Sequence, residues 1–138
     1  MPRTRPETRA RARALQAIYA WDVRGGDLER VAQIVWDDLA VPPDERQFAA
    51  RLVRTLAGER AGIDAALSDV TTNWRLERLG VIDRTVLRLA AAELQRGETP
   101  PRVVIQEALR LAERYGSPQS ARFVNGVIDA LARRMGRL

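Results

Sequence analysis

The sequence contains neither cysteine nor histidine in its 138 residues. Without cysteine the chain has no disulfides and no thiol nucleophiles, and without histidine it lacks the commonest general base and transition-metal ligand. Its three serines, Ser68, Ser117 and Ser120, lie in no G-x-S-x-G nucleophile motif. These absences disfavour catalysis, and we expect neither an enzymatic activity nor a bound cofactor or metal.

Long uncharged apolar runs are missing as well. No segment approaches the ~20 apolar residues that a membrane-spanning helix needs, and residues 1–13 alternate arginine with small or polar residues instead of forming an apolar signal segment. Apolar residues make up 46% and charged residues 30%, which is typical of globular domains. We therefore predict a single cytoplasmic domain over residues 1–138 that makes no membrane contact.

The positive charge of the chain comes from arginine side chains alone, because all 23 basic residues are arginine and lysine is absent. The net charge of +5 favours polyanionic partners through release of counterions from phosphates. A genome-wide bias toward arginine codons explains the same composition. Whatever its origin, a guanidinium group can bind phosphates bidentately and stack on bases.

Apolar residues recur at spacings of three and four along the whole chain, and no alternating pattern long enough for a strand is present. The fold class is therefore predicted to be all-α, with about seven helices. We expect Asp27, Asp44 and Ser117 to cap helices, and Gly58 and Gly62 to kink the third one. The expected helices cover about residues 6–22, 28–39, 45–67, 75–79, 81–96, 101–115 and 118 onward.

The segment 68–80 is poor in apolar periodicity and rich in residues that cap helices. We place there a junction between two small packed bundles, of about residues 1–70 and 71–138. The helix over 81–96 is apolar around most of its circumference, so it is predicted to be the central element.

The first helix carries a candidate RNA-binding face. Arg5, Arg9, Arg13 and Gln16 recur every three to four residues and so share one side of the helix. Tyr19 follows one turn later and could stack on a base. A solvated charged face and a packed tyrosine account equally well for this pattern.

The start of the last helix is a second candidate. Arg122, Phe123 and Asn125 follow a Ser-Pro turn, so a guanidinium, a ring and an amide lie close to free backbone N–H groups. Phe123 falls at the edge of the apolar stripe, where it is either a core residue or a half-exposed stacking platform. Gly126 weakens the helix by roughly 1 kcal/mol relative to alanine, which close helix approach at Gly126 or a contact from Asn125 would offset.

Polar residues on the predicted central helix form a third group, Asp83, Arg84, Arg88 and Glu93. Unpaired buried charge is costly, so these side chains must face solvent, a partner or each other.

Three segments in order resemble the NusB family: ARARALQAIYAWD (10–22), VIDRTVLRLAAAEL (81–94) and VVIQEALRLAERYGSPQSARFVNGVIDALAR (103–133). The resemblance covers nearly the whole chain and implies about seven helices in two bundles. It also implies a transcription antitermination factor that pairs with NusE, a small-subunit ribosomal protein. The pair would bind single-stranded boxA RNA of ribosomal RNA transcripts and join an antitermination complex on RNA polymerase.

The resemblance also assigns roles to residues. It implies RNA contacts by the N-terminal arginines, Arg11 as well as Arg9 and Arg13, and places Asp83 and Arg84 at the surface for NusE. This chain departs from the family in having Ala12 where glutamate is frequent and Pro118-Gln119 where an acid is common. The full set of predicted RNA-binding residues is Arg5, Arg9, Arg11, Arg13, Gln16, Tyr19, Arg88, Arg122, Phe123 and Asn125.

Other functions remain open at this point. NusB-like domains also serve as RNA-targeting modules of ribosomal RNA methyltransferases, although no methyl-donor-binding βαβ pattern is present here. A protein-interaction scaffold or a homodimer would carry the same apolar helix faces. A DNA-binding regulator is less favoured, because no short helix-turn-helix is evident.

Overall fold

The computed structural model describes residues 5–71 and 75–138, and this part of the chain is helical without strands. Six α-helices and one 3₁₀ turn are found, close to the seven helices predicted, and the all-α class is confirmed. Their bounds are α1 (Pro6–Arg24), α2 (Leu28–Asp38), α3 (Pro43–Val70), η1 (Leu76–Arg78), α4 (Val81–Arg96), α5 (Pro101–Tyr115) and α6 (Ser120–Arg134).

Of the three predicted N-caps, only that at Asp27 is present. The carboxylate of Asp27 accepts a hydrogen bond from the Arg30 N–H at 3.0 Å, as an N-cap does. The predicted cap at Asp44 is wrong, because α3 already begins at Pro43, where a fixed φ suits the first helical position. The kink in α3 falls at Glu59 (φ −116°, ψ 15°), between the two glycines expected to cause it.

The start of α6 differs from the prediction, since Ser117 is not its N-cap. The Ser120 hydroxyl accepts a hydrogen bond from the Ser117 N–H at 2.9 Å, and the Ser120 N–H donates to the Ser117 carbonyl at 3.0 Å. These two bonds close a turn and delay the helix to Ser120. Gly116 makes the turn possible, because a Cβ there would lie 2.5 Å from Ser120 Oγ and 2.7 Å from the Ala112 carbonyl oxygen.

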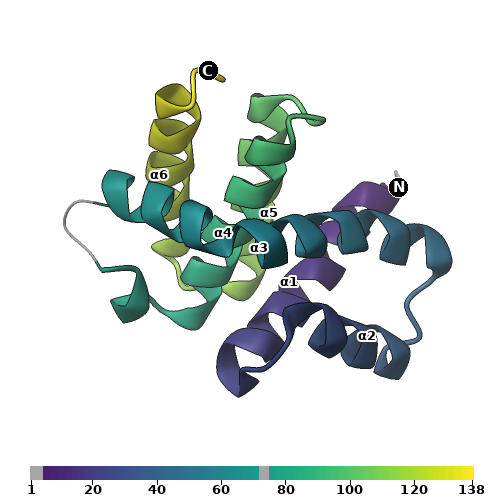
Figure 1. The fold of residues 1–138 in the computed structure, drawn as a ribbon. Helices are drawn as coiled ribbons and strands as arrows, with labels where there is room; N and C mark the ends of the chain where they lie inside the picture. Colours follow the sequence, from purple (N-terminus) through teal and green to yellow (C-terminus); the bar gives the residue numbers. More distant parts are fainter. Residues whose placement is uncertain (1–4, 72–74) are drawn as a thin grey trace.

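Helix α4 is the central element, as predicted. It contacts α1, α3, α5 and α6, and every residue from Thr85 to Leu94 is buried. Figure 1 shows α5 and α6 side by side at one end of the molecule and α1 with α2 at the other. Because α4 contacts both groups, the division into bundles of about 1–70 and 71–138 remains our interpretation.

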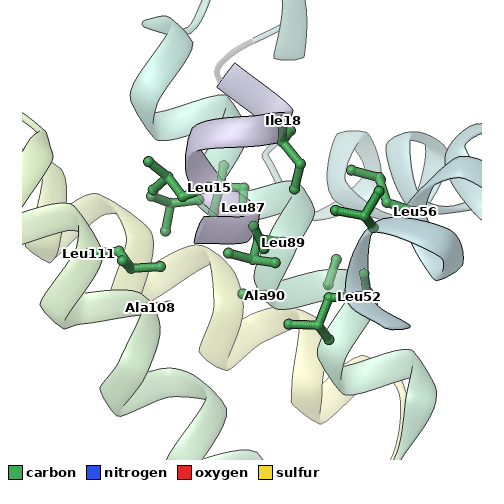
Figure 2. Close-up of a cluster of buried hydrophobic side chains, with 14 of the residues drawn as sticks. Leu15, Ile18, Leu52, Leu56, Leu87, Leu89, Ala90, Ala108 and Leu111 are labelled. Atoms are coloured by element: carbon green, nitrogen blue, oxygen red, sulfur yellow. The ribbon is translucent and has the colours of Figure 1, made fainter. Parts of the chain in front are cut away.

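The core joins these helices through close-packed aliphatic side chains (Figure 2). Burial of such side chains contributes about 1.5–3 kcal/mol each and fixes how α1 lies against α3, α4 and α5. The side chains labelled in Figure 2 are Leu15 and Ile18 of α1, Leu52 and Leu56 of α3, Leu87, Leu89 and Ala90 of α4, and Ala108 and Leu111 of α5.

No helix within the described ranges combines the length and the apolar character that crossing a membrane requires.

Candidate nucleic-acid interface

An open groove of about 620 Å³ runs between α1 and α5. The α1 side is lined by Arg9, Arg13 and Gln16, three of the predicted RNA-binding residues. The two helices touch where Thr8 Oγ1 donates to Glu107 Oε1 at 3.0 Å. The opposite side of α1 packs into the core, since Ala10, Ala14, Ile18 and Trp21 are buried. The predicted division of α1 into an apolar and a cationic face is therefore present.

Glu45 of α3 pairs with both groove arginines of α1. Its carboxylate oxygens lie 3.1 Å from Arg9 Nε and 3.3 Å from Arg13 Nε, and its own side chain is buried. Arg13 also donates to Gln16 Oε1 at 3.3 Å. Two guanidinium groups share one carboxylate, and their side chains remain 41% and 30% exposed. The acid thus orients the arginines without neutralising the face.

Arg11 lies on the other side of α1, inside the protein. Its guanidinium donates to both carboxylate oxygens of Glu93, with Nε 2.8 Å from Oε1 and Nη2 2.6 Å from Oε2. Burial by itself lowers the pKa of Arg11, but the hydrogen bond and charge of Glu93, with the charges of Glu107 and Glu7, raise it above its usual value. The expectation that Arg11 contacts RNA is revised, because its charge is engaged beneath the surface.

Arg88 of α4 is also buried. It donates to both carboxylate oxygens of Asp64, at 2.9 and 3.0 Å, and lies over the Trp21 ring at 5.5 Å from the centroid. Arg84 binds both oxygens of Asp22, at 2.8 and 3.1 Å, and donates to the Leu79 carbonyl at 2.9 Å. These arginines hold α4 against α1 and α3, so we revise the expectation that they face RNA or NusE.

Asp83 differs from its neighbours on α4. It is half-buried in the first turn, and its carboxylate has no hydrogen bond or ion pair to any residue of 5–71 or 75–138. A carboxylate in the first turn of a helix lies at the positive end of the helix dipole, which is favourable for a negative charge. Asp83 is therefore the member of this group that remains open to a partner.

The rings and the α6 residues lie outward. Tyr19 is 42% exposed, and Phe123 is half-buried against the core. Arg122 and Asn125 are exposed, and so is Arg5 at the start of α1. The expectation that Gly126 allows another helix to approach closely is wrong, because a Cβ there would meet nothing within 4 Å.

The groove and the start of α6 are adjacent along the chain. Tyr115 lines the groove, and the turn at 116–119 leads directly from it to Ser120. The structure therefore gathers Arg9, Arg13 and Gln16 at one site and Arg122, Phe123 and Asn125 at a neighbouring one, with Arg11 and Arg88 beneath the surface.

Sequence reasoning missed two features of this site. The α5 wall carries Arg110 and Arg114, four residues apart, a spacing that could have been noticed as a second arginine row. Nothing local pointed to Glu45, because its pairing with Arg9 and Arg13 is formed only when α3 packs on α1.

The fold and the groove define a small all-helical protein with an arginine-rich outer face. The chain belongs to the NusB family, whose model matches residues 8–133. It is 46% identical over 132 residues to the transcription antitermination protein NusB of Anaeromyxobacter dehalogenans strain 2CP-1, covering 94% of this chain and 92% of that protein. It is 43% identical over 129 residues to the NusB protein of Sorangium cellulosum, covering 93% and 92%.

Solved structures agree with this assignment. The T. maritima NusB structure matches with a TM-score of 0.86 at 34% identity, over 95% of this chain and 93% of that one. A structure of antitermination factors NusB and NusE in complex with double-stranded RNA matches with a TM-score of 0.87 at 28% identity, over 96% and 99%.

Proposed function

We propose that this protein is a transcription antitermination factor that acts by binding and not by catalysis. With NusE it binds the single-stranded boxA element of ribosomal RNA transcripts and supports antitermination by RNA polymerase. Its place of action is the cytoplasm, where such transcripts are made. The observation that carries the proposal is the outward face of α1, where Arg9, Arg13 and Gln16 line an open groove.

The chemistry of this face suits a single RNA strand. Guanidinium groups bind phosphates, and exposed rings provide platforms for unpaired bases. Tyr19 is exposed near one end of the α1 row, and Phe123 is partly exposed beyond the groove. Residues Arg5, Arg122 and Asn125 complete the proposed contact surface, which excludes the buried Arg11 and Arg88.

The proposed surface for NusE is the start of α4. Asp83 presents a carboxylate there that is unpaired among the described residues, whereas the guanidinium of the next residue, Arg84, is bound to Asp22. The solved relative that contains both NusB and NusE supports a protein partner of this kind.

A salt-dependent titration tests the proposal. Labelled boxA RNA is titrated with the protein in the presence of NusE. The logarithm of the binding constant should fall linearly with the logarithm of the salt concentration between about 50 and 200 mM. Arg9→Gln with Arg13→Gln should lower affinity and reduce the salt slope by about 0.7 for each phosphate that is no longer neutralised. Arg54→Gln with Arg102→Gln, on exposed residues of α3 and α5 outside the groove, is the control for the same change in net charge.

The strandedness of the RNA is tested in the same assay. Unlabelled single-stranded boxA should compete more strongly than a duplex of the same sequence, because only unpaired bases can stack on Tyr19 and Phe123. If the duplex competed as strongly as the single strand, the proposed preference for single-stranded RNA would be wrong. An absence of RNA binding at low salt would favour a protein-interaction scaffold, and light scattering would then show whether the chain is a homodimer.

A further inference from the structure

The α5 side of the groove carries a row of arginines that matches the row on α1. Arg110 and Arg114 are four residues apart, so they share one face of α5 and are separated by roughly 6 Å along the helix axis. Arg9 and Arg13 have the same spacing on α1. All four side chains line the same groove, so cations stand on both of its walls.

The α5 arginines are available to a ligand. The Arg110 side chain is 70% exposed, and its Nε lies 4.0 Å from Glu107 Oε1, at the limit of an ion pair. That carboxylate also accepts a hydrogen bond from Thr8 at 3.0 Å and lies 3.8 Å from Arg11. Glu107 therefore belongs to the interior network more than to Arg110. Arg114 is exposed, and its guanidinium carbon lies 5.4 Å from the centroid of the Tyr115 ring.

The acids of the groove are unequally placed. Glu107 is mostly buried, and Glu45 lies beneath the α1 arginines. Glu113 is the lining acid that is exposed. The rim that a strand would meet therefore offers four guanidinium groups and a single open carboxylate, and Tyr115 contributes a half-buried ring.

We propose that Arg110 and Arg114 of α5, with Tyr115, form the second wall of the RNA site, so that the strand lies in the α1–α5 groove and leaves it toward the start of α6. This inference rests on the proposed function. Two rows of cations at matching spacing hold a sugar-phosphate backbone from both sides, whereas α1 alone contacts it from one. Tyr115 supplies a stacking platform between the groove and Phe123.

The test compares two double variants in the boxA titration with NusE. Arg110→Ala with Arg114→Ala removes the α5 row, and alanine keeps the helix because its propensity is the highest. Arg54→Ala with Arg102→Ala removes the same charge from exposed positions on α3 and α5 that lie outside this groove. The groove variant should bind roughly tenfold more weakly, with a salt slope reduced by about 1.4, and the control should stay close to wild type.

A third variant tests whether a more positive groove binds RNA more tightly. Glu113→Gln removes the open carboxylate of the groove and should strengthen binding, because phosphates no longer face a like charge. Circular dichroism and unfolding curves establish that each variant is folded.

Failure of this inference is distinguishable from failure of the proposed function. If the α5 variant and its control behave alike while the Arg9 and Arg13 variant still loses affinity, the strand does not use the α5 wall. If the wild-type protein with NusE binds no boxA RNA, both proposals are overturned.

Discussion

Arg11 and Glu93 form a buried ion pair that joins α1 to α4, with Arg11 Nη2 2.6 Å from Glu93 Oε2 and the two side chains 5% and 4% exposed. Thr99 Oγ1 donates to the same carboxylate oxygen at 2.8 Å, and the Arg11 guanidinium lies over the Phe48 ring. Every part of this pair is thus satisfied within the protein. Arg11 therefore positions α1, including the face that carries Arg9 and Arg13.

Removing one partner of this pair should destabilise the fold. Arg11→Met leaves the Glu93 charge buried without its partner and should lower the free energy of unfolding by about 3–5 kcal/mol. The double variant Arg11→Met with Glu93→Leu should recover most of the loss. Urea unfolding of both single variants and the double variant measures the coupling.

This experiment also decides the role of Arg11. If Arg11→Met kept wild-type stability but lost RNA affinity, Arg11 would be an RNA contact after all. Because the pKa of Arg11 is raised when the protein is folded, the contribution of Arg11 to stability is fully present below its unfolded pKa and is lost only as the pH rises through the higher folded pKa. The effect of the substitution should therefore not change over the ordinary pH range.

Glu45→Gln should strengthen RNA binding. The substitution removes the buried carboxylate that Arg9 and Arg13 share, so both guanidinium groups become freer to bind phosphates. We expect a several-fold gain in affinity with a steeper salt dependence, and a loss of about 1 kcal/mol in unfolding free energy. A weaker complex from a folded variant would mean that the orientation provided by Glu45 matters more than its charge.

Asp83 and Arg84 are neighbours on α4, and we expect substitution of the first to change NusE affinity and substitution of the second to change stability. Asp83→Asn should lower NusE affinity by roughly tenfold and leave stability near wild type, because its carboxylate has no partner among the described residues. Arg84→Ala should cost about 3 kcal/mol of stability, since it leaves Asp22 with a more distant arginine, Arg88, at 3.5 Å. Calorimetric titration with NusE and thermal unfolding separate the two roles.

The exposed ring of Tyr19 and the half-buried ring of Phe123 should contribute to RNA affinity through stacking. Phe123→Ala and Tyr19→Ala should each weaken boxA binding by roughly five- to hundredfold if a base stacks there. Tyr19→Phe keeps the ring and serves as the matched control. Phe123→Leu preserves apolar packing against the core but not stacking, so an unchanged affinity in that variant would assign Phe123 to packing alone.

Two glycines near the start of α6 should respond oppositely to alanine. Gly116→Ala places a Cβ against Ser120 Oγ and the Ala112 carbonyl, and it should lower stability by about 1–3 kcal/mol. Gly126→Ala meets no atom of the described chain within 4 Å and should raise stability by about 1 kcal/mol. Thermal unfolding measures the stability of both variants, and the titrations measure their RNA and NusE binding. Loss of RNA or NusE binding in the more stable Gly126→Ala variant would place a partner against that helix face.

The sequence by itself determined the helices. The predicted limits of α4 coincide with those observed, and Asp27 caps α2 as expected, because apolar periodicity and capping act between residues a few positions apart. The start of α6 could not be predicted as well, since the side chain of Ser120 returns to the backbone of Ser117.

The tertiary structure decided which arginines reach the surface. Arg9 and Arg11 are two residues apart and alike in sequence, yet one lines an open groove and the other is buried. Each pairs with a glutamate, Glu45 or Glu93, that reaches α1 only when α3 and α4 pack against it. Both guanidinium groups pair with a glutamate and have the same chemistry, but only that of Arg9 also remains exposed to solvent, and this difference comes from how the helices pack around them.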